Sequence, residues 1–189
     1  AEEVAAENGR VFFSGGADIL CRANICSRFA ERIMIYMGSF KAETFDELFD
    51  VLKSLPWESF IGKDDAFPVK GWSINSALHS VPGCQSIIKK AVVERLKSVY
   101  GISWFKESGA AYRISFSIMK NTASLYIDTS GEGLHKRGYR PRSNAAPIKE
   151  TLAAAMAYLT GIFDDSYVYD PFCGSGTILI ESAMMAANI

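Results

Sequence analysis

An eight-residue stretch near the C-terminal end of the chain constrains its fold more than any other sequence feature. It reads Asp170-Pro171-Phe172-Cys173-Gly174-Ser175-Gly176-Thr177. A short apolar run at 167–169 precedes it, and a helical-looking run at 178–187 follows it. A strand, a glycine-rich turn and a helix in this order open a nucleotide-binding half-domain. We therefore expect an α/β layer with a ligand at the helix N-terminus, where free N–H groups and a partial positive charge collect.

Two common phosphate-binding motifs do not fit this stretch. A P-loop needs a Lys before its Ser or Thr, and no Lys precedes Thr177. A dinucleotide fingerprint needs a third glycine, and Leu179 occupies that position. What remains is an acidic residue that leads into a glycine pair. A G-x-G turn by itself fits a structural loop equally well, but the whole eight-residue string is more specific.

The string resembles the first motif of S-adenosylmethionine-dependent methyltransferases that methylate amino groups. The chemistry agrees with this resemblance, because the cofactor carries no phosphate and requires no Lys. Its ammonium group suits a carboxylate such as Asp170, and its carboxylate suits the backbone N–H groups of a glycine turn.

Length and composition exclude several classes of protein. The 189 residues allow one or two domains, and 49% hydrophobic with 22% charged residues is ordinary for a globular chain. No apolar run reaches the roughly 18 residues of a membrane span, and the acidic N-terminus is not a signal peptide. We expect a cytoplasmic protein. With a net charge of −1, any nucleic-acid binding must come from a local basic patch.

The cysteines do not form a metal-binding pattern. Cys21 and Cys26 lie five positions apart without a second ligand pair at zinc spacing. We expect no metal site, and buried free thiols in a reducing compartment. No general base is placed near Cys173 by sequence, so that residue is interpreted as a small packing residue.

The first 41 residues predict a strand, a helix and a second strand. A turn at Asn8-Gly9 precedes a strand at 10–13, and Asp18 is a candidate N-cap for a helix. The strand at 33–37 is expected to be mostly buried. Together these elements indicate a small α/β layer whose beginning is expected to be missing.

The next stretch predicts an α+β domain. Thr44 and Glu47 form a capping box for a helix to about residue 55, and a strand is expected at 67–71. A long amphipathic helix is predicted from 85 to 100, followed by a hairpin of alternating apolar residues at 112–127. The long helix is expected to face inward with Ile88, Ala91, Val92, Leu96 and Val99, and to expose Lys89, Lys90, Arg95 and Lys97 on a solvated face.

A basic segment follows, in which Lys136, Arg137, Arg140 and Arg142 place four positive charges in seven residues, with His135 and Tyr139 between them. Basic side chains hold phosphates and an aromatic ring can stack on an unpaired base, so the segment can bind RNA. An interdomain linker with solvated charges is the alternative, and composition alone does not decide between them.

After this segment, Pro147 is expected in the first turn of a helix that ends at Gly161. Its apolar stripe is expected to consist of Leu152, Met156 and Leu159.

Four strings in this order, Asp128-Thr129-Ser130-Gly131, Leu134 to Arg140, Ala146 to Ala155 and Asp170 to Thr177, resemble the THUMP-containing methyltransferases of large-subunit ribosomal RNA. Members of this family are often labelled adenine-specific DNA methylases. The resemblance implies the end of a ferredoxin-like region at 1–41, a THUMP domain at 42–129, a basic linker at 130–146 and the start of a Rossmann-like domain at 147–189. The expected fold class is α+β followed by α/β.

The resemblance also implies a site. Asp170 to Thr177, with Pro147 and Thr151, would bind S-adenosylmethionine, and Lys136, Arg137, Tyr139, Arg140 and Arg142 would contact ribosomal RNA. The implied reaction is methylation of an exocyclic amine of guanine or adenine in protein-free or partly assembled large-subunit RNA. The Asn/Asp-Pro-Pro-aromatic motif that holds the target amine in this family is not in the chain, so no catalytic residue is predicted. We therefore expect an interior piece of a longer protein, inactive by itself. An RNA-binding module and a DNA methyltransferase are the alternatives.

Overall fold

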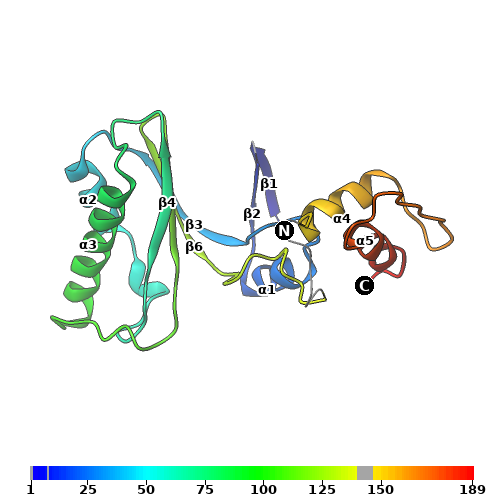
Figure 1. Ribbon diagram of the computed structural model, residues 1–189. Coiled ribbons are helices and arrows are strands. Elements are labelled where there is room, and N and C mark those ends of the chain that lie inside the picture. The colour runs from blue at the N-terminus through cyan, green and yellow to red at the C-terminus, as the bar shows by residue number, and fades with distance from the viewer. Residues whose placement is uncertain (1, 8, 140–146) are drawn as a thin grey trace. The chain divides into compact units, whose positions relative to one another are not determined.

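The computed structural model describes residues 2–7, 9–139 and 147–189 of the chain. The chain divides into two compact units, one of residues 34–131 and the other of residues 1–33 together with 132–189. Figure 1 shows the elements of both units.

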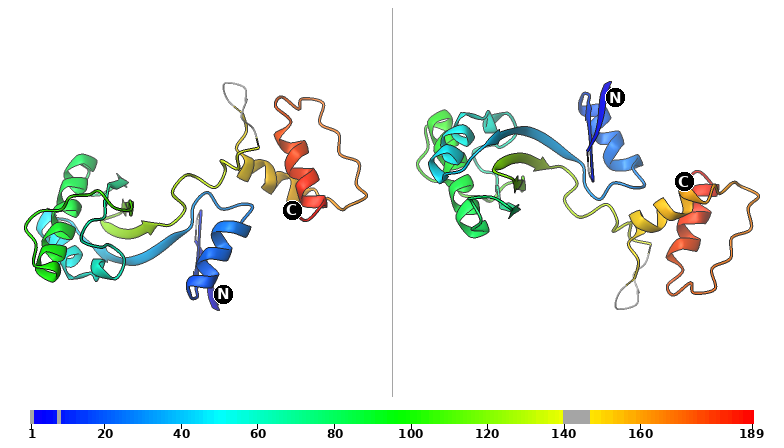
Figure 2. Two further views of the ribbon diagram at one scale, coloured as in Figure 1. Left: turned by 90° about the horizontal axis from the view of Figure 1, so that it is seen from below. Right: turned by 90° about the horizontal axis from the view of Figure 1, so that it is seen from above.

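The unit of residues 34–131 is a four-stranded sheet with helices on one face (Figures 1 and 2). Its strands are β3 (Met34–Lys41), β4 (Val69–Ile74), β5 (Ile114–Met119) and β6 (Thr122–Asp128), in the spatial order β3-β6-β5-β4. β4 runs parallel to β5, and the other two pairs are antiparallel. The covering helices are α2 (Phe45–Ser54) and α3 (Val81–Tyr100), with a short 3₁₀ turn η1 (Trp57–Ser59).

The core of this unit lies between the sheet and the two helices. β5 and β6 form the predicted hairpin, and the turn between them places Lys120 and Asn121 at φ 50° and 62°, the left-handed geometry of a tight hairpin turn. Large side chains that are fully buried in this core include Leu48, Leu52, Trp57, Phe67, Ile88, Leu96, Ile114, Ile118 and Leu125.

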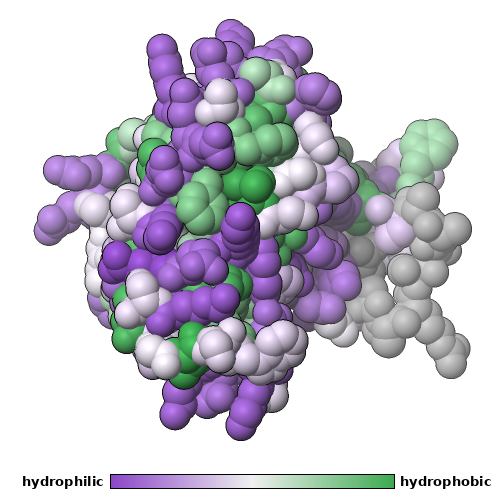
Figure 3. Space-filling model, turned by 90° about the vertical axis from the view of Figure 1, so that its left-hand side faces the viewer, coloured by the Kyte–Doolittle hydropathy of each residue, from purple (hydrophilic) through white to green (hydrophobic). Residues whose placement is uncertain are grey.

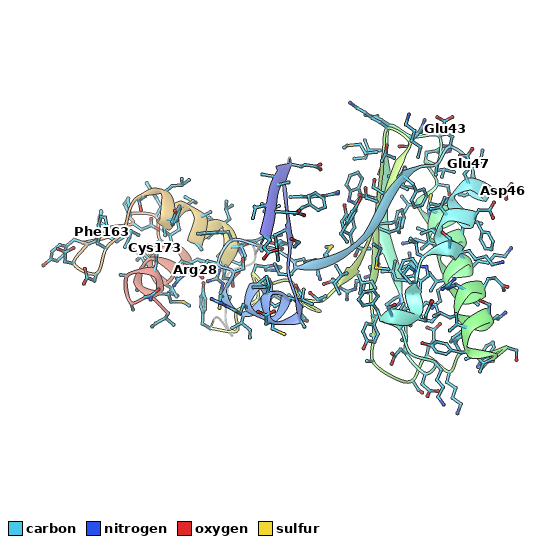
Figure 4. The ribbon with its side chains drawn as sticks, turned by 180° about the vertical axis from the view of Figure 1, so that it is seen from behind. Arg28, Glu43, Asp46, Glu47, Phe163 and Cys173 are labelled. Atoms are coloured by element: carbon cyan, nitrogen blue, oxygen red, sulfur yellow. The ribbon has the colours of Figure 1, made fainter. Side chains whose placement is uncertain are left out.

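The predicted capping box at the start of α2 is confirmed. The Thr44 hydroxyl accepts a hydrogen bond from the backbone N–H of Glu47 at 3.2 Å, and the Glu47 carboxylate accepts from the N–H groups of Glu43 and Thr44. These bonds hold the pKa of Glu47 below its ordinary value. Figure 4 shows Glu43, Asp46 and Glu47 together at this helix end.

Replacing Thr44 by Ala should therefore destabilise the unit by about 1 kcal/mol, the usual cost of losing an N-cap side chain. Urea unfolding followed by tryptophan fluorescence measures the change, because Trp57 is buried in the folded unit and becomes exposed on unfolding. Asp46→Ala, which removes a first-turn side chain without a role in the capping box, is the control. An equal loss of stability in both variants would contradict the assignment of the cap.

Helix α3 begins earlier than predicted, because the Ser80 side chain caps it and accepts from the N–H of Gly83. Four of its five predicted inward residues are buried, whereas the prediction for Val99 is wrong, since its side chain is 45% exposed. Three of its basic residues form ion pairs within the unit: Arg95 pairs with Glu58, Lys89 with Glu107, and Lys97 with Glu94. Figure 3, which views the helical side, shows a largely hydrophilic surface.

The other unit contains a hairpin of β1 (Glu2–Glu7) and β2 (Arg10–Ser14), and the helices α1 (Ala17–Cys26), α4 (Glu150–Leu159) and α5 (Thr177–Ala186). β1 was not predicted. The predicted cap at Asp18 is wrong, because Gly16 is the N-cap and Asp18 lies in the first turn of α1.

The strand expected at 33–37 also differs from its prediction. As β3 it pairs with β6 in the sheet of the first unit, and none of its residues is fully buried. The thiols of Cys21, Cys26 and Cys173 are exposed rather than buried, and only that of Cys84 lies in a core.

Three predictions near the C-terminal end are wrong. Pro147 lies before α4 rather than in its first turn, and the run at 167–169 is not a strand. The expected apolar stripe of α4 is exposed, because α4 buries its small residues Ala153, Ala154 and Ala157 instead. A strand requires neighbouring strands for its hydrogen bonds, and the described part of this unit has only the β1–β2 hairpin.

Among the described residues, no helix is both long and apolar enough to cross a membrane.

Candidate functional site

The predicted glycine turn leads directly into helix α5. Gly174 and Gly176 have φ values of 54° and 72°, a left-handed backbone that favours glycine. The N–H of Gly176 donates to the carbonyl of Cys173 at 2.7 Å, which closes the turn. Gly176 is the N-cap of α5 and provides no capping side chain. The turn therefore ends at a helix N-terminus, where backbone donors and the helix dipole attract anionic groups.

The space above the two glycines is open. A Cβ atom at Gly176 would meet no atom within 4 Å, and one at Gly174 would meet only the Phe172 carbonyl at 3.9 Å. Glycine is therefore favoured here by backbone conformation and not by crowding. The absence of side chains leaves the backbone accessible to a ligand.

Asp170 provides the carboxylate of the turn. One of its oxygens accepts a hydrogen bond from the N–H of Phe172 at 3.0 Å, which fixes the side chain against the backbone. The Ser175 and Thr177 hydroxyls lie 3.2 Å apart at the other end of the turn, and Thr177 is buried. Phe172 is 92% exposed, and Figure 4 labels the neighbouring Cys173.

A hollow of about 240 Å³ lies beside the turn, between α4, the segment before Asp170, and α5. Its walls are mostly apolar and are formed by Met156, Ala157, Thr160, Val168, Tyr169, Asp170, Pro171, Ile178 and Ser182. This volume is smaller than that of most ligand pockets, so it can receive only part of a cofactor-sized molecule.

The residues of the turn fit S-adenosylmethionine in charge. Asp170 offers an anion for the ammonium group of the cofactor, and the α5 N-terminus offers donors for its carboxylate. The open glycine backbone permits the close approach that such contacts need.

Thr151, the other predicted cofactor contact on α4, is buried against Glu31. Its hydroxyl lies 3.3 Å from the Glu31 carboxylate, which also accepts from Lys149 at 2.8 Å and lies 2.7 Å from Nδ1 of His135. Burial raises the pKa of Glu31, but the hydrogen bond and charge of Lys149 with the charge of His135 lower it below its ordinary value. The structure thus directs Thr151 toward a polar cluster with Glu31. Pro147 is partly buried ahead of the helix.

Two predicted RNA contacts, Arg137 and Tyr139, bind the buried carboxylate of Glu181 on α5. Arg137 donates to one Glu181 oxygen at 2.7 Å, and the Tyr139 hydroxyl donates to the other. Arg137 also donates to the backbone carbonyl of Arg28, a residue labelled in Figure 4. Glu181 is fully buried and the Arg137 side chain is only 15% exposed. These side chains therefore lie inside the unit.

The remaining predicted RNA contacts are divided between the surface and the undescribed segment. Lys136 is 57% exposed and lies 3.4 Å from the exposed Glu132. Arg140 and Arg142 fall outside the described residues. Within the described ranges, no group of His, Cys, Asp or Glu side chains could hold a metal ion.

Sequence reasoning missed Glu31 and Glu181. Neither forms a local pattern with its partners, since Lys149 is 118 residues from Glu31 and Arg137 is 44 residues from Glu181. The sequence offered one signal for Glu181, which is the only charged residue of α5 and lies one turn into the helix.

Comparison with known protein families identifies three domains along the chain. Residues 1–34 match the RlmL ferredoxin-like domain, residues 42–128 match the THUMP domain, and residues 137–189 match the RMKL-like methyltransferase domain.

Individual relatives agree with these domains. The chain is 51% identical over 189 residues to YpsC of Bacillus subtilis (strain 168), which is provisionally named an RNA methyltransferase, and covers 49% of it. It is 37% identical to the ribosomal RNA large subunit methyltransferase K/L of Magnetococcus marinus, of which it covers 27%. The solved structure of SMU.472, provisionally named a methyltransferase and complexed with SAH, is 41% identical with a TM-score of 0.92.

The match to SMU.472 extends over 99% of this chain and 50% of that one, so the chain spans about half the length of these relatives or less. In the order of its domains the chain is similar to the THUMP-containing methyltransferases: residues that match an RlmL-type ferredoxin-like domain are followed by a THUMP domain and by residues that match the RMKL-like methyltransferase domain.

Proposed function

We propose that the protein carrying this chain methylates an exocyclic base amine of large-subunit ribosomal RNA, with S-adenosylmethionine as the methyl donor. The glycine turn at the N-terminus of α5, with Asp170 leading into it, is the observation that carries the proposal. The likeness to SMU.472 supports the choice of cofactor, because that protein was solved with SAH. The K/L methyltransferase of Magnetococcus marinus supports large-subunit ribosomal RNA as the substrate.

In this proposal the chain binds the cofactor and positions it. Asp170 holds the ammonium group, and the backbone donors at the start of α5 hold the carboxylate. When bound, S-adenosylmethionine supplies a methyl group that an exocyclic amine of guanine or adenine can attack directly. The contribution of the protein is then mainly orientation, which lowers the barrier without a covalent enzyme intermediate. The target base has to leave its stack to reach such a site.

The described structure changes which residues we propose as RNA contacts. Lys136 keeps its role as a phosphate contact, because its ammonium group is exposed. Arg137 and Tyr139 are assigned to the packing of α5 instead, because both bind the buried Glu181 carboxylate. We retain Arg140 and Arg142 as proposed contacts on the basis of sequence alone. The THUMP domain is proposed to supply the rest of the RNA surface.

Asp170→Asn tests the cofactor site. Asn keeps an oxygen that can accept from the N–H of Phe172 but loses the charge for the ammonium group. A hydrogen bond to a charged group contributes about 1.5–3 kcal/mol, so the affinity for S-adenosylmethionine should fall at least tenfold. Isothermal calorimetry with the protein that carries this chain measures it, and Asp165→Asn on the exposed preceding loop is the matched control. Equal affinity of the two variants would contradict a role for Asp170.

Methyl transfer tests the reaction and the substrate. The same protein is incubated with tritiated S-adenosylmethionine and either protein-free large-subunit ribosomal RNA or double-stranded DNA. We expect label in the RNA alone, and mapping of the labelled base distinguishes guanine from adenine. Label in DNA alone would overturn the proposed substrate, and cofactor binding without label in either would favour an RNA-binding module.

A further inference from the structure

One tryptophan of the THUMP-domain unit lies almost entirely in solvent. Trp104, in the loop between α3 and β5, is 80% exposed, whereas Trp57 is fully buried and Trp72 is 40% exposed. Burying a large apolar side chain contributes about 2–3 kcal/mol, so leaving an indole in water forgoes a substantial stabilisation. Isolated exposed apolar residues are common. The contacts of the loop around Trp104 therefore decide whether the surrounding structure holds the indole in solvent.

The residues that follow Trp104 anchor the loop to the core. Phe105 is 9% exposed and contacts Phe67 edge to face, with ring centroids 5.7 Å apart. The Lys89 ammonium lies 3.6 Å from the centre of the Phe67 ring and 2.5 Å from the Glu107 carboxylate. The neighbour of Trp104 thus points into the core and holds the indole on the outer side.

The second half of the loop is fixed by hydrogen bonds to the loop at 62–65. The N–H of Gly109 donates to the carbonyl of Asp64 at 2.7 Å, and that of Ala110 donates to the Asp65 carboxylate at 3.1 Å. Glu107 has a φ of 49°, a left-handed conformation that costs a non-glycine residue about 1–2 kcal/mol. Such strain persists only where the surroundings determine the conformation, and it concentrates at binding sites. The exposure of Trp104 is therefore imposed by an anchored loop.

The charges near the indole are available to a ligand. Lys106 is exposed two positions after Trp104, beyond the buried Phe105, and Lys63 is exposed on the neighbouring loop. Within the described part of the chain, neither lysine has an ion-pair partner, whereas Glu107 is paired with Lys89. Asp65 accepts from two backbone N–H groups, those of Gly62 and Ala110. Asp64, which follows Lys63 in the chain, is also exposed.

We propose that this loop is an RNA contact, in which Trp104 stacks on an unpaired base and Lys106 binds an adjacent phosphate. Stacking of bases on aromatic side chains and cations along the backbone are how proteins hold single-stranded nucleic acid. The inference rests on the proposed RNA substrate. It gains weight because Arg137 and Tyr139 are occupied by Glu181, so RNA needs other contacts on the molecule.

Titration of the 189-residue chain with a fluorescein-labelled single-stranded RNA, followed by anisotropy at fixed salt, tests the inference. One stacked base contributes about 1–3 kcal/mol, so Trp104→Ala should weaken binding by about 5- to 150-fold. Trp104→Phe keeps an aromatic face and should restore part of the affinity. Val99→Ala, which truncates an exposed apolar side chain of the same unit, should leave it unchanged. Lys106→Gln should reduce the slope of log affinity against log salt by about 0.7, the value for one phosphate on a single strand.

The outcomes separate this inference from the proposed function. If Trp104→Ala binds the RNA as tightly as the unchanged chain, the loop is not an RNA contact, although RNA remains the proposed substrate. If the unchanged chain binds no RNA while the cofactor experiments succeed, both the loop contact and the RNA role of the THUMP domain are wrong. If Trp104→Ala instead dissociates a dimer of the chain, the indole belongs to a protein interface and the inference is overturned.

Discussion

Replacing Glu181 by Gln should loosen helix α5 by about 3 kcal/mol. The substitution keeps the shape of the side chain but removes the negative charge that Arg137 and the Tyr139 hydroxyl bind. Glu181 is fully buried and Arg137 nearly so, which leaves the guanidinium without a counterion in an environment of low polarity. Removing one partner of a buried ion pair costs about 3–5 kcal/mol, and a Gln oxygen that still accepts a hydrogen bond places the cost at the lower end.

Hydrogen exchange of the α5 amides measures this effect where it occurs. A loss of about 3 kcal/mol corresponds to roughly a hundredfold faster exchange through local opening. Glu132→Gln is the matched control, because its pair with Lys136 is exposed and should contribute less than about 1 kcal/mol. Comparable exchange in the two variants would show that the buried pair does not hold α5. Because α5 begins at the glycine turn, Glu181→Gln should also weaken cofactor binding.

The second large effect is expected for Gly71→Ala in β4. Gly71 pairs with Phe116 of the parallel strand β5, and a Cβ atom there would lie 2.2 Å from the Phe116 carbonyl oxygen and 2.4 Å from its ring. Neither group can move aside without a large energetic cost, because the carbonyl belongs to a central strand and Phe116 is only 2% exposed in the core. Overpacking of this kind costs about 1–3 kcal/mol and occasionally more, and the backbone clash places the expected loss near 3 kcal/mol.

Urea unfolding followed by tryptophan fluorescence measures the loss, as a lower midpoint with an unchanged slope. Ser73→Ala, two positions along the same side of β4, is the control. The Ser73 hydroxyl is buried and has no hydrogen-bond partner within the described ranges, so its removal should leave stability unchanged or slightly higher. A Gly71→Ala variant that unfolds at the original midpoint would mean that β4 and β5 can separate without cost.

The elements that could be predicted from sequence are those whose determinants are local. The capping box of Thr44 and Glu47 spans four residues, and the hairpin of β5 and β6 is closed by its own turn. The glycine turn is equally local, since its left-handed backbone favours glycine at 174 and 176. In each case the residues that determine the structure are adjacent in the chain.

The predictions that are wrong depend on partners far away in sequence. The strand β3 was assigned to the small α/β layer of residues 1–41 because it follows α1 in the chain. Its hydrogen-bond partner β6 lies nearly 90 residues further along. The RNA contact of Arg137 stays a prediction, but the sequence offers no local signal for the buried carboxylate that its guanidinium binds, which lies 44 residues away on α5. The helical period of Leu152, Met156 and Leu159 identifies an apolar face without showing that α4 buries its alanines instead.

The pairing of β3 with β6 has a consequence for the order in which the chain folds during synthesis. Met34 and Asp128 are register partners on these antiparallel strands, so the THUMP-domain unit begins and ends at neighbouring positions and is inserted within the other unit. Domains generally fold as units while the ribosome adds residues. The inserted unit can therefore complete its sheet once residue 131 has emerged. The segment that contains Arg28 and Glu31 can form its contacts only later, because its partners Arg137 and Lys149 are synthesised after the inserted unit.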